Sequence, residues 1–410
     1  MSNNNGFIGK ELNSTGTVTV AGADSHWSMA SNLFVGDNGN GTLNIETGGL
    51  VSSDAGFIGA QSNSNGTVNV TGLGAQLNPT FFLIVGDNSV GTLNIDAGGE
   101  VSNIDGLIGN GLNAVGTVSV TGAGSQWNSS GDLTIGAGGI GTLNLVDQGE
   151  VNVGGNCING AGVSTVNVDG GVLSVVEEID VDTFNIGNAA FTEGSHTVAG
   201  GQVLVAGSLN VGNSGAGAIH VEASGLVSSI NSAIGFAADA TGTATITGTG
   251  SQWNSSNSLF VGGGGTGTLN VAAGGVVTNT FGSIGTFGGS TGTVTVNGMD
   301  SQWNSSGDLG VGDFGNGTLS IEAGGVVTNV NGVIGFLAEA TGSATVAGTG
   351  SQWNSSETLR IGAFGTGLLD VEAGGVVTNT AGVIGTDIGS TGTVTISGAG
   401  SQWDNSASLG

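Results

Sequence analysis

A repeat of about 25 residues runs through most of this sequence and limits its possible folds more than any other feature. The motif Gly-Thr-apolar-polar-apolar recurs at this interval from Gly16 to Gly141 and, with looser matches, from Gly217 to Gly392. A second signal has twice that period, since Trp recurs in every second copy, with Leu77 as a substitute. The Trp positions are Trp27, Trp127, Trp253, Trp303, Trp353 and Trp403. The shorter repeat is therefore the structural unit, and two alternating versions of it form the longer sequence repeat.

Each unit contains three short runs of apolar or alternating residues, separated by Gly, Asn, Ser and Asp, which favour turns. In residues 17–20, for example, Val18 and Val20 point to one side and the two Thr residues point to the other. Val, Ile and Thr favour strands. No segment keeps a helical period, so we expect little helix.

Three strands in a unit of this length are too few for an independent domain but suit one coil of a parallel β-helix. The sequence therefore predicts an all-β fold, a right-handed parallel β-helix (β-solenoid) of about 16 coils with three short strands per coil. Val, Ile and Leu would stack inside in columns, and Thr would lie outside. At about 4.8 Å per coil, such a solenoid would be roughly 75–80 Å long.

The pattern predicts one continuous solenoid with three regions. Residues 1–155 and 217–410 are regular coils, the second region ending in a truncated coil, and residues 156–216 are irregular, with longer loops or a changed cross-section. Neither end carries a capping pattern, which predicts a fragment of a longer array or ends covered by a neighbouring chain. The sequence shows no signal-peptide pattern and no apolar stretch long enough to span a bilayer as a helix, so we expect no membrane insertion of this segment.

Charge narrows the possible partners. The chain has 30 acidic and 2 basic residues, a net charge of −28, which argues against nucleic acid and anionic lipid because phosphate binding needs clustered Lys and Arg. A single cysteine, Cys157, excludes an intramolecular disulfide and any multi-Cys metal site. By position we expect Cys157 to be a small apolar residue of the stack, where Phe57 and Leu107 lie in earlier coils.

The units around Trp303 carry a family resemblance. They read Gly292-Thr-Val-Thr-Val, Ser301-Gln-Trp303-Asn-Ser-Ser-Gly-Asp-Leu, Val311-Gly, Gly317-Thr-Leu-Ser-Ile and Glu322-Ala-Gly-Gly-Val. This pattern resembles the repeat associated with type V secretion and PEP-CTERM proteins, which occurs in bacterial autotransporter passenger domains, and it covers residues 6–155 and 217–410. The resemblance implies an adhesin-like parallel β-helix located extracellularly or at the bacterial cell surface. It brings no catalytic residues to this chain.

The Trp column is the first candidate binding site. Its members would lie about 10 Å apart, two strand spacings, and an exposed row could stack on the sugar rings of a glycan. The candidate residues are Trp253, Trp303, Trp353 and Trp403. The other interpretation, which we expect, is that Trp fills a wide corner of the core and alternates with Val of the other half-unit, such as Val326, with the neighbouring Gln accepting the indole N–H.

Two surface patterns suggest other ligands. A flat outward row of Thr residues resembles the water-ordering face of ice-binding proteins, although Asn44 and Asn94 interrupt it. Asp37, Asp87 and Asp313 occur in Val-Gly-Asp loops that superficially resemble calcium-binding repeats. The acidic segment is formed by Glu177, Glu178, Asp180 and Asp182, and we expect it to be a solvated loop. We therefore expect no cofactor, with calcium as the one alternative.

An enzyme is not the expected function. Polysaccharide-degrading β-helix enzymes need a groove with carboxylates and usually basic residues, but the only two basic residues, Lys10 and Arg360, are far apart in the sequence. His26, His196 and His220 lie at unrelated positions without a Ser-His-Asp context. A polysaccharide-degrading activity remains an alternative, located in the irregular centre.

The sequence thus predicts a non-enzymatic rod for surface display, in which stacked coils give stiffness and the negative charge keeps rods soluble and apart. Expected partners are a glycan or protein of a host surface or matrix, or further copies of the chain, end to end or side by side.

Overall fold

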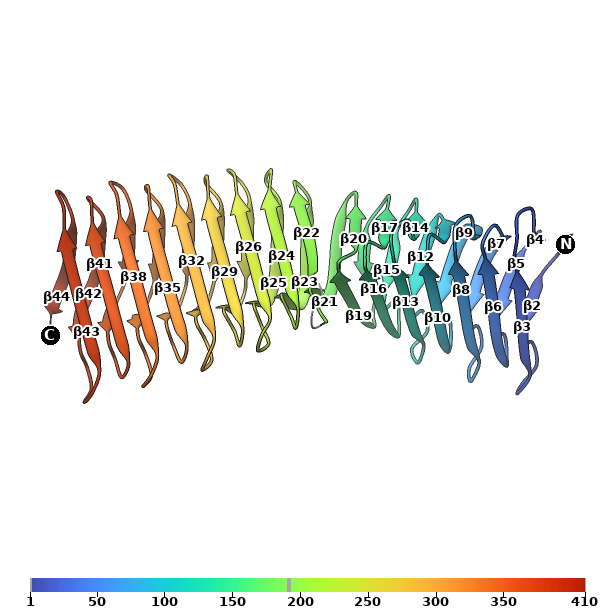
Figure 1. Ribbon diagram of the computed structural model, residues 1–410, viewed down its shortest axis with the longest axis horizontal. Coiled ribbons are helices and arrows are strands. Elements are labelled where there is room, and N and C mark those ends of the chain that lie inside the picture. The colour runs from blue at the N-terminus through green and yellow to red at the C-terminus, as the bar shows by residue number, and fades with distance from the viewer. Residues whose placement is uncertain (1, 190–192, 410) are drawn as a thin grey trace. The chain divides into compact units, whose positions relative to one another are not determined.

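The computed structural model describes residues 2–189 and 193–409, which form strands, turns and loops without a helix (Figure 1). It is an all-β parallel solenoid of about 16 coils, in which equivalent residues of the first ladder recur at the interval predicted from the sequence, and this confirms the predicted fold class. The chain divides into two compact units, unit 1 over Met1–Asn185 and unit 2 over Ile186–Gly410. This division falls inside the irregular segment 156–216. The part of the chain described contains no helix that could cross a membrane.

The first ladder consists of the Gly-Thr strands. In unit 1 these strands are β3 (Thr15–Val20), β6 (Asn40–Glu46), β8 (Asn65–Thr71), β10 (Val90–Asp96), β13 (Val115–Thr121), β16 (Ile140–Val146) and β19 (Val163–Asp169). In unit 2 they are β22 (Glu193–Ala199), β24 (Ala216–Glu222), β26 (Thr241–Thr247), β29 (Thr266–Ala272), β32 (Thr291–Asn297), β35 (Asn316–Glu322), β38 (Thr341–Ala347), β41 (Thr366–Glu372) and β43 (Thr391–Ser397).

The second ladder consists of the strands that carry Trp, or in its place Val or Leu, together with the short strand β1. In unit 1 these are β1 (Ser2–Asn3), β4 (His26–Met29), β7 (Leu50–Ile58), β9 (Gln76–Val85), β11 (Glu100–Asn103), β14 (Gln126–Ser129), β17 (Glu150–Val153) and β20 (Val172–Val175). In unit 2 they are β23 (Gln202–Val211), β25 (Leu226–Ile234), β27 (Gln252–Ser255), β30 (Val276–Asn279), β33 (Gln302–Ser305), β36 (Val326–Asn329), β39 (Gln352–Ser355), β42 (Val376–Ile384) and β44 (Gln402–Leu409).

The third ladder leads to the Gly that closes each coil. In unit 1 its separate strands are β2 (Gly6–Ile8), β5 (Asn32–Val35), β12 (Asp105–Ile108), β15 (Leu133–Ile135), β18 (Cys157–Asn159) and β21 (Glu178–Ile186). In unit 2 they are β28 (Ser258–Val261), β31 (Phe281–Ile284), β34 (Leu309–Val311), β37 (Gly332–Ile334) and β40 (Thr358–Ile361). The longer strands β7, β9, β23, β25, β42 and β44 run through both the second and the third faces.

Neighbouring coils pair in parallel, with equivalent residues opposite each other. Thr92 lies between Thr67 and Thr117 in the first ladder. Along the same strand Leu93 and Ile95 have no exposed surface, whereas Thr92 is half-buried on the outside. Because the register is kept from coil to coil, the inward residues of all coils form continuous aliphatic columns.

The turn from the third strand to the next Gly-Thr strand requires glycine. Gly36 has a φ of 69°. A Cβ atom built on it would lie 2.4 Å from the carbonyl oxygen of Asn65 in the next coil, so the two coils approach too closely for a side chain.

Strand β21 differs from the regular coil. Its first residues pair with the third ladder, where Ile179 lies opposite Cys157, and its later residues lie beside β19 of the first ladder. The side chains of Asn167 and Asn185 are hydrogen-bonded across 18 sequence positions, where regular coils have 25. One corner of the coil is therefore missing here, and the chain between the paired strands is shorter at this point than in a regular coil. Residues 190–192 of the irregular segment lie outside the described part.

Candidate functional site

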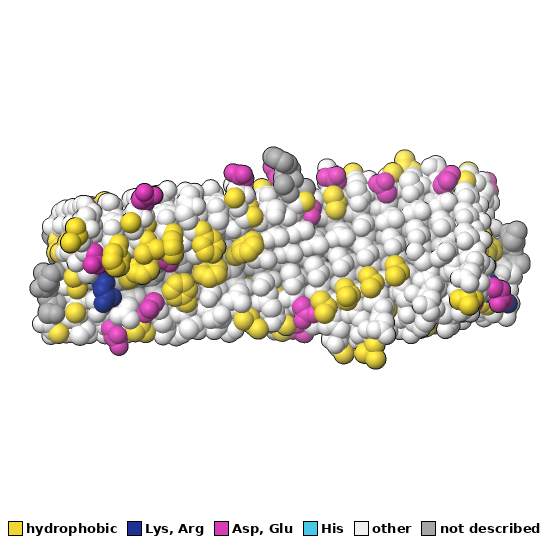
Figure 2. Space-filling model, turned by 90° about the horizontal axis from the view of Figure 1, so that it is seen from below, with side chains coloured by type: hydrophobic (Ala, Val, Ile, Leu, Met, Phe, Trp, Pro, Cys, Tyr) yellow, Lys and Arg dark blue, Asp and Glu magenta, His cyan; other side chains and the backbone are white. Residues whose placement is uncertain are grey.

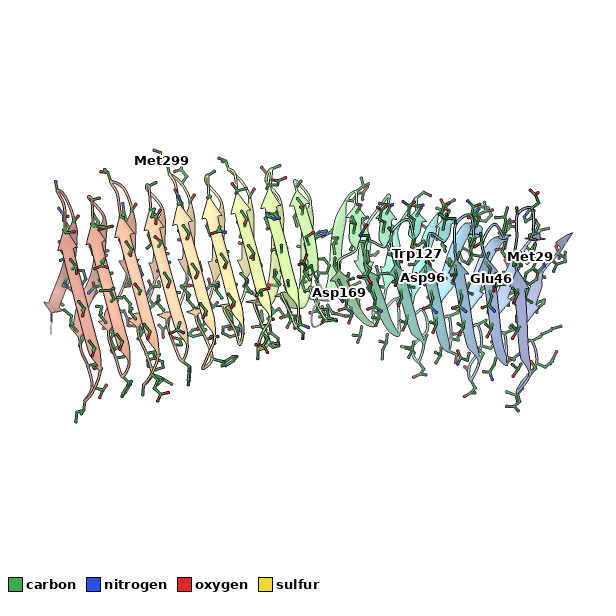
Figure 3. All side chains as sticks on the ribbon, viewed as in Figure 1. Met29, Glu46, Asp96, Trp127, Asp169 and Met299 are labelled. Carbon is green, nitrogen blue, oxygen red and sulfur yellow. The ribbon has the colours of Figure 1, made fainter. Side chains whose placement is uncertain are left out.

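The structure places the Trp column in the core. Trp253, Trp303 and Trp353 have no exposed surface, and the same holds for Trp127 inside unit 1 (Figure 3). Trp403, in the last described coil, is half-buried. A ring without exposed surface cannot stack on a sugar, so this finding corrects the glycan-stacking hypothesis for Trp253, Trp303 and Trp353 in favour of the core interpretation.

Two details of the Trp environment differ from the expectation. In the second ladder Trp303 lies between Val277 and Val327, so the inward Val is one residue later than Val326. The indole N–H of Trp303 donates to Oδ1 of Asn279, 2.5 Å away, and not to a neighbouring Gln. The Gln side chains point outward because consecutive residues of a strand face opposite sides.

The Trp environment explains why the sequence repeat spans two coils. Trp127 donates its N–H to Asn103 Oδ1 of the preceding coil at 2.6 Å. A Cβ atom on Gly106, also in that coil, would lie 2.8 Å from Trp127 Cζ2 and 2.8 Å from Leu133 Cδ1. The indole and the Leu side chain thus occupy the space that the Gly leaves. A coil with Trp thus needs a neighbour that accepts the indole N–H and leaves room for the ring, usually through Asn and Gly, and so two versions of the coil alternate.

One coil of unit 2 solves the same problem with other residues. Ser229 stands at the Asn position and Ser232 at the Gly position. Trp253 donates to Ser232 Oγ at 3.0 Å, and the Ser255 and Ser229 hydroxyl groups lie 2.8 and 2.7 Å from the same oxygen. The acceptor of the indole N–H thus stands at the Gly position instead of the Asn position, and the N–H of Trp253 keeps a hydrogen-bond partner.

This exchange predicts strong coupling between the two serines. Ser232→Gly alone removes the acceptor of the Trp253 N–H and is expected to cost about 1–3 kcal/mol, because a buried donor loses its partner. Adding Ser229→Asn recreates the arrangement around Trp303 and should recover most of that loss. A double-mutant cycle on urea midpoints should give a coupling of about 1–2 kcal/mol. Additive effects would contradict this account.

Leu77 marks the coil without an indole. Ser53, opposite Pro79 in the ladder, stands at the Asn position of the preceding coil. It is 3% exposed and its hydroxyl has no hydrogen-bond partner among the described residues. An unpartnered buried hydroxyl fits a position that elsewhere accepts an indole N–H.

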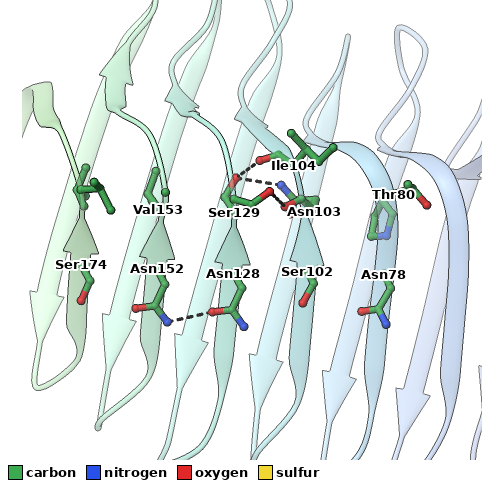
Figure 4. Close-up of a pocket in the computed structure, with 15 residues that line it drawn as sticks. Asn78, Thr80, Ser102, Asn103, Ile104, Asn128, Ser129, Asn152, Val153 and Ser174 are labelled. Atoms are coloured by element: carbon green, nitrogen blue, oxygen red, sulfur yellow. Dashed lines mark hydrogen bonds between the residues drawn. The ribbon is translucent and has the colours of Figure 1, made fainter.

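The surface is hollowed where the chain leaves the second ladder. In unit 1 this hollow, which we call the corner groove, has a volume of about 800 Å³ and runs across five neighbouring coils (Figure 4). One outward row of side chains lines it, made up of Asn78, Ser102, Asn128, Asn152 and Ser174. Sequence analysis missed this groove, because alternation along a strand shows that the row faces outward but not that the surface there is concave.

The row in the corner groove has free hydrogen-bonding capacity. Asn152 Nδ2 donates to Asn128 Oδ1 at 2.9 Å. The side chains of Asn78, Ser102 and Ser174 make no hydrogen bond with any residue that the structure describes. An amide offers two donors and one acceptor oxygen, and a hydroxyl offers both functions, so the row can bind a polar ligand.

Apolar and acidic residues complete the surroundings of the corner groove. Pro79, Ile104 and Val175 also line it. Asn128 Nδ2 lies 3.5 Å from Glu100 Oε1, so a carboxylate adjoins the row. Neither of the two basic residues of the chain, Lys10 and Arg360, is among the lining residues. The groove can therefore accept a neutral or cationic ligand more readily than an anion.

The same corner in unit 2 has smaller hollows with a saturated row. Their volumes are about 390 and 320 Å³. Here Thr278, Thr328 and Thr378 each donate to the Asn of the preceding coil at 2.8 Å. Side chains that bond one another have less capacity for a ligand, so the corner groove of unit 1 is the better candidate site.

The Thr row points outward, as expected, and in unit 1 the row beside it consists mostly of Asn. In unit 1 Asn69 Nδ2 donates to Asn44 Oδ1, and Asn94 Nδ2 to Asn69 Oδ1, both at 2.9 Å. These amides form a ladder that is satisfied along the stack. Such a face lacks the uniform Thr-x-Thr array on which the ice-binding hypothesis depended.

The carboxylates considered for calcium lie in separate surroundings. Asp87 accepts hydrogen bonds from Asn110 at 2.7 Å and Asn88 at 3.2 Å. Burial raises the pKa of both Asp37 and Asp87. Among the described residues, no three His, Cys, Asp or Glu side chains lie close enough together to hold a metal ion.

The acidic segment of the irregular centre is partly integrated into the coil. Asp182 accepts hydrogen bonds from Asn159 Nδ2 at 3.0 Å and from the backbone N–H of Ser164 at 2.8 Å. Burial, and the charge of Asp182, raise the pKa of Asp180. Glu177 is exposed. Asp182 therefore has a structural role, while Glu177 fits the expected solvated position.

Asp313 has a buried carboxyl group with a raised pKa. It is 8% exposed, and Ser283 Oγ donates a hydrogen bond to it. Burial raises the pKa of Asp313 to about 6, although the Ser283 hydrogen bond acts in the opposite direction. The side chain covers Gly310, where a Cβ atom would overlap the carboxylate.

This raised pKa predicts a loss of stability with rising pH. Between the unfolded pKa of about 3.8 and the folded pKa of about 6, the folded chain binds more protons than the unfolded chain, so the free energy of unfolding falls as pH rises. Asp313→Asn should remove this fall and stabilise unit 2 at pH 7 by up to about 3 kcal/mol. Urea midpoints at pH 4 and pH 7 test this, with the exposed Asp239→Asn as control. An equal pH dependence in Asp313→Asn and the unaltered chain would contradict it.

Other predicted residues occupy unrelated places. His196 is buried, and burial lowers its pKa to about 4, whereas His220 is exposed. Lys10 Nζ lies 5.1 Å from the ring centroid of Phe7.

Cys157 has no exposed surface, and burial raises the pKa of its thiol to about 12. It lies opposite Leu133, not at the position of Phe57 and Leu107, which corrects the predicted phase by one residue.

A separate hydrophobic surface follows the loops from the third to the first ladder in unit 2. Each residue of this aromatic ridge is 38–53% exposed, and the ridge consists of Phe236, Phe287, Phe314, Phe336 and Phe364. The rings of Phe336 and Phe364 pack edge to face with centroids 6.3 Å apart. Figure 2 shows hydrophobic side chains gathered on this side of unit 2. In unit 1 the equivalent loops carry mostly polar residues and glycine.

Comparison with known proteins gives little further information. No family model matches the chain, and no curated protein matches it. The solved structures similar to the chain include a crystal structure of a TibC-catalysed, hyper-glycosylated TibA fragment (residues 55–350 of that protein), with 16% identity over all of both chains. Its TM-score is 0.29, too low to support any conclusion about this protein.

Proposed function

We propose that the chain is a non-enzymatic structural passenger of a secreted or cell-surface bacterial protein, adhesin-like, which holds ligand-binding surfaces away from the cell. The observation that carries the proposal is the register of the Gly-Thr ladder, which is kept from β3 to β19 in unit 1 and from β22 to β43 in unit 2. In unit 2, for instance, Gly267, Gly292 and Gly317 lie opposite each other in consecutive coils. Stability then arises from many equivalent interfaces between coils, which suits a spacer that must resist local damage.

The charge of the chain supports this role. A net charge of −28 with polar outward rows favours solubility and opposes close association of neighbouring copies. The acid and base groups described above are dispersed or structural, and none of them forms a nucleophile with an adjacent base. Surface glycans or proteins of a host or matrix are the proposed partners.

Surface display can be tested on the source bacterium. Antibodies against the folded chain should label intact cells, and external protease should remove the label. Labelling only after permeabilisation would contradict the proposal. A panel of acidic polysaccharides incubated with the purified chain should yield no cleavage products, and the appearance of unsaturated sugar ends would instead favour a lyase.

A further inference from the structure

We propose that the corner groove of unit 1 binds a neutral oligosaccharide lying along the stack, across the coils from Asn78 to Ser174. This inference rests on the proposed function and deepens it by naming the ligand class.

The chemistry of the lining favours a polyol. The groove offers amides and hydroxyls, and three of the five side chains in its row have no partner among the described residues. Sugar hydroxyl groups both donate and accept hydrogen bonds, as these side chains do. The apolar residues Pro79, Ile104 and Val175 offer contact to the C–H faces of sugar rings.

The repeat of the groove matches a polymer rather than a compact metabolite. Equivalent side chains recur at about 4.8 Å, so the row spans roughly 19 Å over its five coils. In Figure 4 Asn78, Ser102, Asn128, Asn152 and Ser174 follow one another on successive strands. A linear chain of sugar rings can meet such a row with several contacts, each weak, that add along its length.

Two other ligand classes fit less well. An extended peptide binds by adding a strand to the free edge of a sheet. Asn128 and Asn152 lie on strands that are already paired with a neighbouring strand on each side, so no free edge is present there. An anionic polysaccharide would meet Glu100 beside the row, without any lining Lys or Arg.

An exposed aromatic residue lies next to the groove. Phe81 follows the lining residue Thr80 in the chain, its carbonyl oxygen accepts a hydrogen bond from the N–H of Ile104, and its side chain is 53% exposed. An aromatic ring at this rim can add stacking to a terminal sugar.

The experiment is calorimetric titration of the full chain with three hexasaccharides: cellohexaose, chitohexaose and hexagalacturonate. At least one of the two neutral ligands should bind, and hexagalacturonate should not. Asn78→Ala/Asn152→Ala should weaken that binding about tenfold, because two hydrogen-bonding side chains are lost. The matched control is Asn254→Ala/Asn354→Ala, which removes equivalent outward amides in unit 2 that line none of the hollows described there, and it should leave the affinity unchanged.

A second variant protects the test against unfolding of the first. Ser174 is exposed at one end of the groove, so Ser174→Trp should fold normally and should reduce affinity for the hexasaccharide by obstructing that end. Failure of both neutral ligands to bind, stronger binding of hexagalacturonate, or equal loss in the unit 2 control would overturn the inference. If Phe336→Ser/Phe364→Ser lost binding while the corner groove was unchanged, the ligand would bind at the aromatic ridge, and this result would overturn the inference as well. Because binding is measured on purified protein and display on cells, either proposal can fail while the other stands.

Discussion

Trp303→Ala is expected to lower the free energy of unfolding by about 3–5 kcal/mol. The side chain has no exposed surface, and its removal leaves a cavity between Val277, Val327 and Gly282. The loss also leaves Oδ1 of Asn279 without its indole donor, which adds the cost of a buried unpaired group. Urea denaturation followed by tryptophan fluorescence and far-UV circular dichroism measures the effect.

The control for this substitution is Trp403→Ala. Trp403 makes the same kind of hydrogen bond, to Asn379 at 2.6 Å, but it is half-buried in the last described coil. Since fewer neighbours lose contacts, its replacement should cost clearly less than that of Trp303. If Trp303→Ala cost no more than Trp403→Ala, the ring would not be the core residue that the structure shows.

Gly317→Val is expected to lower the free energy of unfolding by at least about 3 kcal/mol. A Cβ atom on Gly317 would lie 2.1 Å from the backbone nitrogen of Gly312 and 2.5 Å from the carbonyl oxygen of Ile284. Backbone atoms cannot move aside as the end of a flexible side chain can, so the coils must separate locally. Hydrogen exchange should show lost protection in β32, β35 and β38 while distant coils of unit 2 remain protected.

Gly288→Ala is the matched control, because a Cβ atom there would have no heavy atom within 4 Å. It should be neutral or should stabilise by about 0.4–1 kcal/mol through the unfolded state. Comparable damage from both substitutions would show that the contact between coils at Gly317 does not decide the effect.

The sequence determines the fold well because one pattern recurs in every coil. The alternation in residues 17–20 and the regular spacing of Gly predict strands, turns and register together. It is harder to predict which of two neighbouring residues in a strand faces inward. Val326 and Val327 are both Val, so composition could not show which one faces inward, and the structure assigns Val327. Similarly, Asn279 and Gln302 are both amides, and only the geometry identifies Asn279 as the partner of the indole.

The candidate site could not be predicted in this way. Asn78, Ser102 and Asn152 read as ordinary outward residues of strands, and the hollow above them is formed by several coils together, so that no single strand shows it. The irregular centre was equally hard to interpret, because the missing corner at β21 shortens the interval between paired Asn residues from 25 positions to 18 and hides the repeat. A repeating pattern predicts what is common to all coils, whereas the site arises where coils differ.

The stacking of consecutive coils in register is most directly tested by spin labelling. Nitroxides on Thr92→Cys/Thr117→Cys, two outward positions that face each other on neighbouring coils, should show strong dipolar broadening at about 5 Å. The pair Thr67→Cys/Thr142→Cys, three coils apart at about 14 Å, should broaden only weakly. Cys157 is buried and should not take up the label. Sharp, non-interacting spectra from the first pair would contradict the solenoid itself.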